Sequence, residues 1–124
     1  MTTPDDAASR EEFHPASLPG EWQPHEQIPG LRVRELWSRD GGISIALLSF
    51  DQGAGIPRRH QHASNQFMYS LGGRYSYTSS GLELKPGDFY WNPLGNHHGP
   101  TEAIEASVLL EIYDGPHYYE SDVF

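Results

Sequence analysis

The chain has 124 residues, no cysteine and a formal net charge of −9, with 8 Lys and Arg side chains against 17 Asp and Glu side chains. That length is typical of one compact domain with its own buried core. The absence of cysteine excludes disulfides and thiolate metal sites. The acidity argues against nucleic acid or an anionic membrane as a partner, and no apolar run is long enough to span a bilayer.

The first thirty residues differ in composition from the rest of the chain. They are rich in Pro, Glu, Asp, Ser and Gly and contain few aliphatic side chains. This composition predicts an N-terminal arm over residues 1–30 that is partly disordered, or that packs on the domain or on a partner subunit. Asp5 to Glu12 could form a short helix, and Trp22 is a candidate anchor for the arm. Because the start lacks the basic and apolar segments of a signal peptide, we expect a cytoplasmic protein.

From residue 31 onward, short apolar stretches alternate with turn residues. No stretch of ten or more residues has a helical period without a Gly or Pro that would break it. Several short strands at close spacing predict an all-β sandwich or barrel, formed by a single domain over residues 31–124. The expected strand runs are LRVRELW (31–37), ISIALLSF (43–50), QFMYSLGG (66–73), RYSYTSSG (74–81), LELKPGD (82–88), FYWNPLG (89–95) and ASVLLEIYDGP (106–116).

The stretch HQHASNQ, residues 60–66, has the residue types of a metal site. If RRHQH is a strand, His60 and His62 lie on the same face, because side chains alternate along a strand. A turn at HASN would bring Gln66 opposite them, and His97 or His98 in NPLGNHHG could add a further nitrogen. We interpret the remaining histidines as surface residues or hydrogen-bonded core residues: His14, His25 and His117.

The spacing around these histidines resembles the first motif of the cupin superfamily. That motif runs glycine, about five residues, His-x-His, three or four residues, a carboxylate, six residues, glycine. The chain has Gly55, four residues, His60-Gln61-His62, three residues, Gln66, six residues and Gly73. It departs from the family pattern in the shorter first gap and in the glutamine that replaces the carboxylate.

The second cupin motif runs glycine, five residues, Pro-x-Gly, two residues, histidine. The chain matches it at every fixed position with Gly87, the triplet from Pro93 to Gly95, and His98. The turn Pro86-Gly87-Asp88 that leads into it is also usual for the family. This spacing selects His98 as the metal ligand and leaves His97 outside the site.

The cupin resemblance implies a fold, a metal site and an oligomeric state. The fold is a double-stranded β-helix, or jelly roll, with the metal on its inner wall and a pocket open at one end. The resemblance also implies a homodimer that binds a small-molecule substrate. One divalent ion is expected, zinc first, with iron or nickel as alternatives. The implied ligands are His60, His62, Gln66 and His98.

Gln66 makes this ligand set neutral, so that the ion keeps its full charge and is a strong Lewis acid. Such a site favours an enolate, and it resembles that of the small cupin cyclases of aromatic polyketide biosynthesis. These enzymes close a ring by intramolecular aldol condensation with loss of water. Metal-bound hydroxide is the first candidate for the base, with Glu111 and Tyr69 as further candidates. Alternatively, Gln66 only hydrogen-bonds a bound water.

Two other functions remain open from the sequence. The first is a metal-dependent dioxygenase that cleaves a β-diketone or flavonol-like substrate, since three-histidine iron sites with this activity also occur among cupins. The second is a cupin that binds a small molecule without turning it over. The fold by itself does not separate these functions, because cupins carry many chemistries.

Overall fold

The structure is a computed structural model and describes residues 21–117. The segment 1–20, which holds most of the arm expected to be partly disordered and the possible helix from Asp5 to Glu12, lies outside the described residues. The described part is all-β, as predicted, and within it no helix has the length and apolarity to cross a bilayer. Its elements are β1 (Gln23–Pro24), β2 (Leu31–Ser38), a 3₁₀ turn (Asp40–Gly42), β3 (Ile43–Phe50), β4 (Gln66–Tyr77), β5 (Leu82–Leu84), β6 (Phe89–Asn92) and β7 (Thr101–Asp114).

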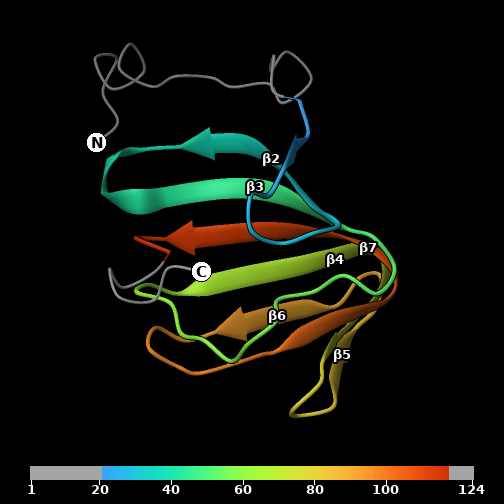
Figure 1. The fold of residues 1–124 in the computed structure, drawn as a ribbon. Helices are drawn as coiled ribbons and strands as arrows, with labels where there is room; N and C mark the ends of the chain where they lie inside the picture. Colours follow the sequence, from blue (N-terminus) through green and yellow to red (C-terminus); the bar gives the residue numbers. More distant parts are fainter. Residues whose placement is uncertain (1–20, 118–124) are drawn as a thin grey trace.

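The strands form one antiparallel sheet in the order β1-β2-β3-β7-β4-β5, and β6 pairs with β4 (Figure 1). The runs QFMYSLGG and RYSYTSSG, expected as separate strands, are the single strand β4, which pairs with β7 along its whole length. The β4–β7 register shifts at three places between Ser70 and Tyr75. Such irregularities bend a strand pair, so the sheet curves around its own inner face.

Alternation along the strands decides which side chains reach the inner face. On β3 every second residue is buried, namely Ser44, Ala46, Leu48 and Phe50. The core cluster collects such inward side chains from five strands and from the segment before β2. It consists of Ile28, Leu31, Leu48, Phe50, Met68, Tyr75, Tyr77, Leu84, Ala103 and Leu109.

The described part of the N-terminal arm packs on its own domain. Strand β1 pairs with β2 through Gln23 opposite Val33 and Pro24 opposite Arg32. Trp22 is 38% exposed, whereas Ile28 is 3% exposed and belongs to the core. Trp22 is therefore only partly buried, and its role as the anchor of the arm stays a prediction. Ile28 joins the described part of the arm to the core.

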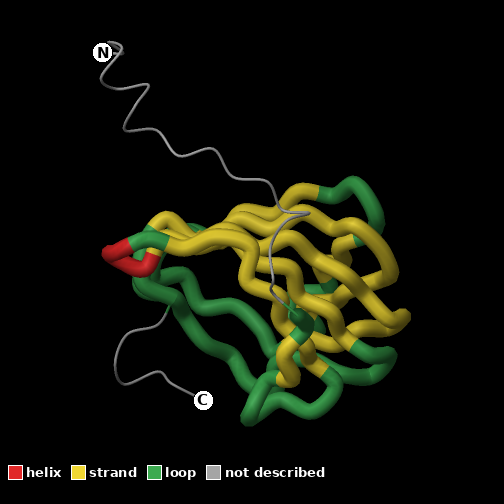
Figure 2. The backbone as a smooth tube through the Cα atoms, turned by 90° about the horizontal axis from the view of Figure 1, so that it is seen from above, coloured by secondary structure: helices red, strands yellow, loops and turns green. Residues whose placement is uncertain are grey.

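Two loop segments, residues 51–65 and 93–100, run beside the curved sheet (Figure 2). The expected strand RRHQH is not regular and forms only an isolated bridge between His60 and His98. In that bridge each backbone N–H donates to the other residue's carbonyl oxygen at 2.8 Å. The bridge fixes the two loops to each other and so brings both cupin motifs together.

The motif glycine Gly73 lies where the β4–β7 pair bends. Its φ is +86°, and a Cβ there would lie 2.2 Å from the carbonyl oxygen of Ala106. Gly53 has nearly the same φ, +85°, but a Cβ there would meet nothing within 4 Å. The left-handed backbone costs an L-residue roughly 1–2 kcal/mol at either position, and overpacking adds roughly 1–3 kcal/mol at Gly73 only.

We therefore expect Gly73→Ala to lower the free energy of unfolding by about 3 kcal/mol or more, and Gly53→Ala by only about 1 kcal/mol. Urea unfolding followed by tryptophan fluorescence measures both losses. Equal losses in the two variants would show that close approach to β7 is not what requires glycine at position 73.

Candidate metal centre

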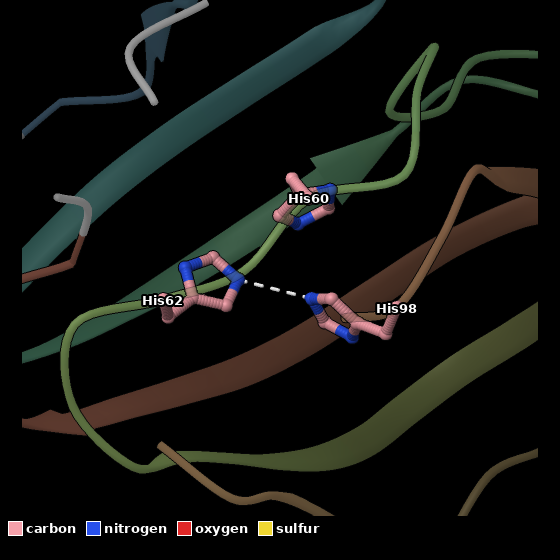
Figure 3. Close-up of side chains that lie close together, drawn as sticks. All are labelled: His60, His62 and His98. Carbon is pink, nitrogen blue, oxygen red and sulfur yellow. Dashed lines mark hydrogen bonds between the residues drawn. The ribbon is translucent and has the colours of Figure 1, made fainter. Parts of the chain in front are cut away.

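The structure brings together three buried histidines, His60, His62 and His98. One nitrogen from each lies within 4.8 Å of the others. Figure 3 shows the three rings converging, with His60 and His62 on one chain segment and His98 on another. They lie in a small cavity of about 30 Å³ inside the curved sheet. This volume has space for an ion.

The backbone places His60 and His62 on the same side although they do not lie in a regular strand. They are 7% and 1% exposed, and Gln61 between them is more exposed. The Nδ1 of His60 lies 3.0 Å from the carbonyl oxygen of Arg58, and the Nδ1 of His62 lies 2.8 Å from that of His117. Because a carbonyl only accepts, both Nδ1 atoms carry the proton, and the unprotonated Nε2 of each ring is the atom that can bind an ion.

His98 fits the same pattern through a tyrosine. Its Nδ1 lies 3.0 Å from the Tyr90 hydroxyl, and its Nε2 lies 3.0 Å from the Nε2 of His62. Two nitrogens that each bind one ion at about 2.1 Å lie about 3.0 Å apart at a right angle and about 3.4 Å apart at the tetrahedral angle, so the observed separation is compatible with two ligands of one ion. The Tyr90 hydroxyl can accept a hydrogen bond from Nδ1–H when Nε2 is a ligand, or donate one to Nδ1 when it is not. The residues therefore fit a divalent cation.

Burial keeps these imidazoles uncharged. It lowers the pKa of His62 to about 4, and the nearby His60 acts in the same direction. Burial likewise lowers the pKa of His98 to about 3, with His60 and His62 adding to the effect. Both rings are neutral at pH 7, the form in which imidazole binds metal.

Gln66 lines the same cavity and is 4% exposed. Its amide nitrogen donates to Glu111 Oε2 at 2.7 Å and to the Tyr113 hydroxyl at 3.1 Å. Only its Oε1, 3.4 Å from the Asn92 amide nitrogen, could face an ion. The role of Gln66 as a fourth ligand thus stays a prediction. A glutamate here could not donate to Glu111 and would place two carboxylates together, which is unfavourable.

Glu111, on β7, also lines the cavity and is largely buried. Its Oε2 accepts hydrogen bonds from Gln66 and, at 3.1 Å, from the Tyr113 hydroxyl. Burial raises the pKa of this carboxyl to about 7, although the two hydrogen bonds act in the opposite direction. A carboxyl with that pKa can both take and return a proton near neutral pH.

The other candidates of the sequence lie away from the three histidines. Tyr69 is 42% exposed, on the opposite face of β4 from the buried Met68 and Ser70. The structure therefore gives no support to Tyr69 as a base in this cavity, because strand alternation directs it outward. His97 is exposed, whereas its neighbour His98 is buried.

Two of the remaining histidines are described, and both have hydrogen-bond partners. The Nδ1 of His25 accepts from the backbone N–H of Gln27 at 3.1 Å. The Nε2 of His117 lies 2.7 Å from the Ser44 hydroxyl, and its ring stacks on Tyr113 with centroids 3.9 Å apart. These two agree with the interpretation made from the sequence. His14 lies outside the described residues.

Sequence reasoning missed the two tyrosines that orient the site, Tyr90 and Tyr113. The Tyr113 hydroxyl lies 3.3 Å from the Nδ1 of His62 and also contacts Gln66 and Glu111. The spacing of two residues between Glu111 and Tyr113 could have indicated a shared face. No such signal marks Tyr90. Phe, Tyr and Trp follow one another in β6, so both faces of the strand carry aromatic side chains.

Comparison with known proteins identifies the family. The sequence model of the ChrR cupin-like domain matches residues 13–117. No curated protein is significantly similar to the chain in sequence. An RmlC-like cupin from Ralstonia eutropha JMP134 has a similar structure, with a TM-score of 0.76, 17% identity and coverage of 95% of this chain and 79% of that one.

Two further structures share the fold. A proposed acetylacetone dioxygenase from Methylibium petroleiphilum PM1 has a TM-score of 0.73 and 19% identity, over 92% of this chain and 85% of that one. Rhodobacter sphaeroides SigE in complex with the anti-sigma ChrR gives a TM-score of 0.61 and 21% identity, over 76% of this chain and 49% of that one. At these identities the likeness establishes a cupin fold. Together with the match over residues 13–117, it shows that the chain is a cupin and belongs to the family of ChrR cupin-like domains.

Proposed function

We propose that this cupin is a metal-dependent enzyme that begins its reaction by removing a proton from a 1,3-dicarbonyl compound. One observation carries the proposal: three buried histidines and the carboxyl of Glu111 line a single cavity. The histidines are the ligands for one divalent ion, zinc first, with iron or nickel as alternatives. When bound, the ion would supply positive charge that stabilises the enolate oxygen as it forms.

Glu111 is the proposed base. The hydrogen atoms between two carbonyl groups are acidic, and a carboxylate with a pKa near 7 matches that task at neutral pH. Gln66 and Tyr113 both donate to Oε2 of Glu111 and so fix its orientation. The protonated Glu111 can then return its proton to an oxygen of the product. This assignment gives the unusual glutamine a role, because a glutamate could not make the same donation.

The finer proposal is ring closure, as in a polyketide cyclase. A carbon next to one carbonyl would attack a second carbonyl carbon of the same chain and form a carbon–carbon bond. The attacked oxygen would take up the proton removed from carbon and become a hydroxyl. Loss of a second proton from the attacking carbon, together with that hydroxyl, would release water and form a carbon–carbon double bond, so that no oxidant is consumed. The adjoining cavity of about 260 Å³, which shares Glu111 and Tyr113 with the histidine cavity, supports this because it could hold the reacting chain in one fold.

A second candidate is a dioxygenase that cleaves the same class of compound. It is favoured by the likeness to two structures described as acetylacetone dioxygenases, those from Methylibium petroleiphilum and, at 16% identity, Acinetobacter johnsonii. Acetylacetone is itself a 1,3-diketone. The neutral ligand set weighs against this candidate, because iron sites that activate dioxygen commonly include a carboxylate.

Turnover with and without air separates the two functions. The metal-loaded protein is given a linear 1,3,5-triketone or acetylacetone, with His98→Ala as the blank. Ring closure predicts a dehydrated cyclic product and the same rate in an anaerobic chamber. A dioxygenase predicts oxygen uptake and no anaerobic turnover. Binding without turnover of either compound would overturn the enzymatic proposal and leave a ligand-binding cupin.

We also propose that two copies of the chain associate through the outer face of the sheet. There, strand pairing sets Phe67 beside Trp91 and Ile112, and Tyr69 beside Phe89 and Leu110. We call these six residues the outer apolar face. Phe89 and Trp91 are 64% and 55% exposed. None of the six is charged, so two copies with a net charge of −9 each could approach here without direct repulsion.

Phe89→Glu would place a charge within this face. We expect the dimer to dissociate about 100-fold more readily or worse, because the charge would be buried without a partner. Size-exclusion chromatography with light scattering gives the mass. Leu82→Glu is the control, since Leu82 on β5 is 41% exposed but lies outside the outer apolar face. If wild type has the mass of one chain, or both variants dissociate alike, this interface is wrong.

A further inference from the structure

A second and larger cavity lies beside the histidines, and we call it the apolar chamber. It has a volume of about 260 Å³ and lies against the inner faces of β2, β3 and β7, which are neighbours in the sheet. Its lining surface is mainly apolar, with aliphatic side chains contributed by Ile28, Leu31, Val33, Ala46, Leu48 and Ile56. Polar side chains also line it, among them His25, Ser44 and the exposed Glu35.

The apolar chamber adjoins the histidine cavity. Leu48, Ile56, Glu111 and Tyr113 line both spaces. Glu111 and Tyr113 are also the groups that face Gln66 in the histidine cavity. A ligand whose polar end lies at the histidines would therefore extend past Glu111 into a space with aliphatic walls.

The size and shape of the apolar chamber indicate what that extension would be. A dry apolar cavity of about 150 Å³ binds benzene, so about 260 Å³ is ample for one aromatic ring and far more than a methyl group fills. The rings of Tyr113 and His117, which stack on each other with an interplanar angle of 22°, also belong to the lining.

We propose that the apolar chamber selects 1,3-dicarbonyl compounds that carry an aromatic substituent over small aliphatic ones. The dicarbonyl end lies at the histidines, and the ring lies among the side chains of β2 and β3. This inference rests on the proposed function, whose substrate class it narrows. We propose Val33 as a specificity-determining residue. It lines the chamber from β2, which is two strands away from Glu111 on β7, so a change there alters the chamber away from the proposed base.

The test compares two probes, benzoylacetone and acetylacetone, which differ by a phenyl in place of a methyl group. Equilibrium binding to the metal-loaded wild-type protein is measured by calorimetry. Burying the ring should make benzoylacetone bind about 10- to 100-fold more tightly. Val33→Phe narrows the chamber where the ring would lie, so it should weaken benzoylacetone about tenfold and leave acetylacetone within about twofold.

Val108→Phe is the matched control. It makes the same change of side chain at a position on β7 that lines neither cavity. The wild-type comparison needs no variant to fold, and Val33→Leu provides a milder change. This inference is overturned if wild type binds the two probes equally, or if Val33→Phe and Val108→Phe have equal effects on benzoylacetone binding. Either result would leave the proposed function standing. If neither probe binds, the proposed function fails, and the specificity of the chamber fails with it.

Discussion

Replacing His98 by Ala should abolish metal retention, whereas replacing its neighbour His97 by Ala should not. His98 is 8% exposed, and its Nε2 lies 3.0 Å from that of His62. His97 is exposed and lies outside the three-histidine group. Even residues that only support a ligand change metal affinity by about 10- to 100-fold, so loss of a ligand should cost about 100-fold or more.

Elemental analysis of both variants, purified beside wild type, gives the metal content per chain. We expect about one ion in wild type and in His97→Ala, and none in His98→Ala. Retention by His98→Ala would remove it from the ligand set, and loss by His97→Ala would mean that the wrong histidine was chosen. The identity of the retained ion also bears on the reaction, since zinc favours ring closure and iron favours oxygen chemistry.

Glu111→Gln should lower kcat about 100- to 10,000-fold, the usual contribution of a general base. Glutamine is nearly isosteric with glutamate and keeps an oxygen that can accept from Gln66 and Tyr113, but it cannot take a proton from carbon. Metal content should stay at the wild-type level, because Glu111 does not belong to the group of three histidines that would bind the ion. Steady-state kinetics with the turned-over diketone measure the effect. An unchanged kcat would place the base elsewhere.

The same variant tests the pKa of Glu111 through stability. Burial raises the pKa to about 7 from 4.5, so the folded state keeps the proton that the unfolded chain loses above about pH 4.5. Wild type therefore loses stability as the pH rises from about 4.5 to 7, and glutamine, which does not ionise, avoids that loss. In metal-free protein, urea unfolding should show equal stabilities near pH 4.5. At pH 8 the variant should be more stable by about 3 kcal/mol.

The sequence determined the features that depend on local spacing. The one-residue gap between His60 and His62 puts them on one side of the backbone, and the spacing from Pro93 to His98 distinguishes His98 from His97. Period-two alternation set the inward faces of β3 and of the first half of β4. Each of these follows from distances of a few residues, over which backbone geometry alone fixes direction.

Only the tertiary structure decided which distant residues meet. Glu111 and Tyr113 lie 45 and 47 residues after Gln66 along the chain. The strand order and the β4–β7 register bring both into hydrogen-bond contact with Gln66. No local pattern fixes the register between strands that are separated by other elements. For the same reason the sequence could not separate Glu111, which faces inward, from Tyr69, which faces solvent. It also could not place the apolar chamber, whose walls come from both ends of the described chain.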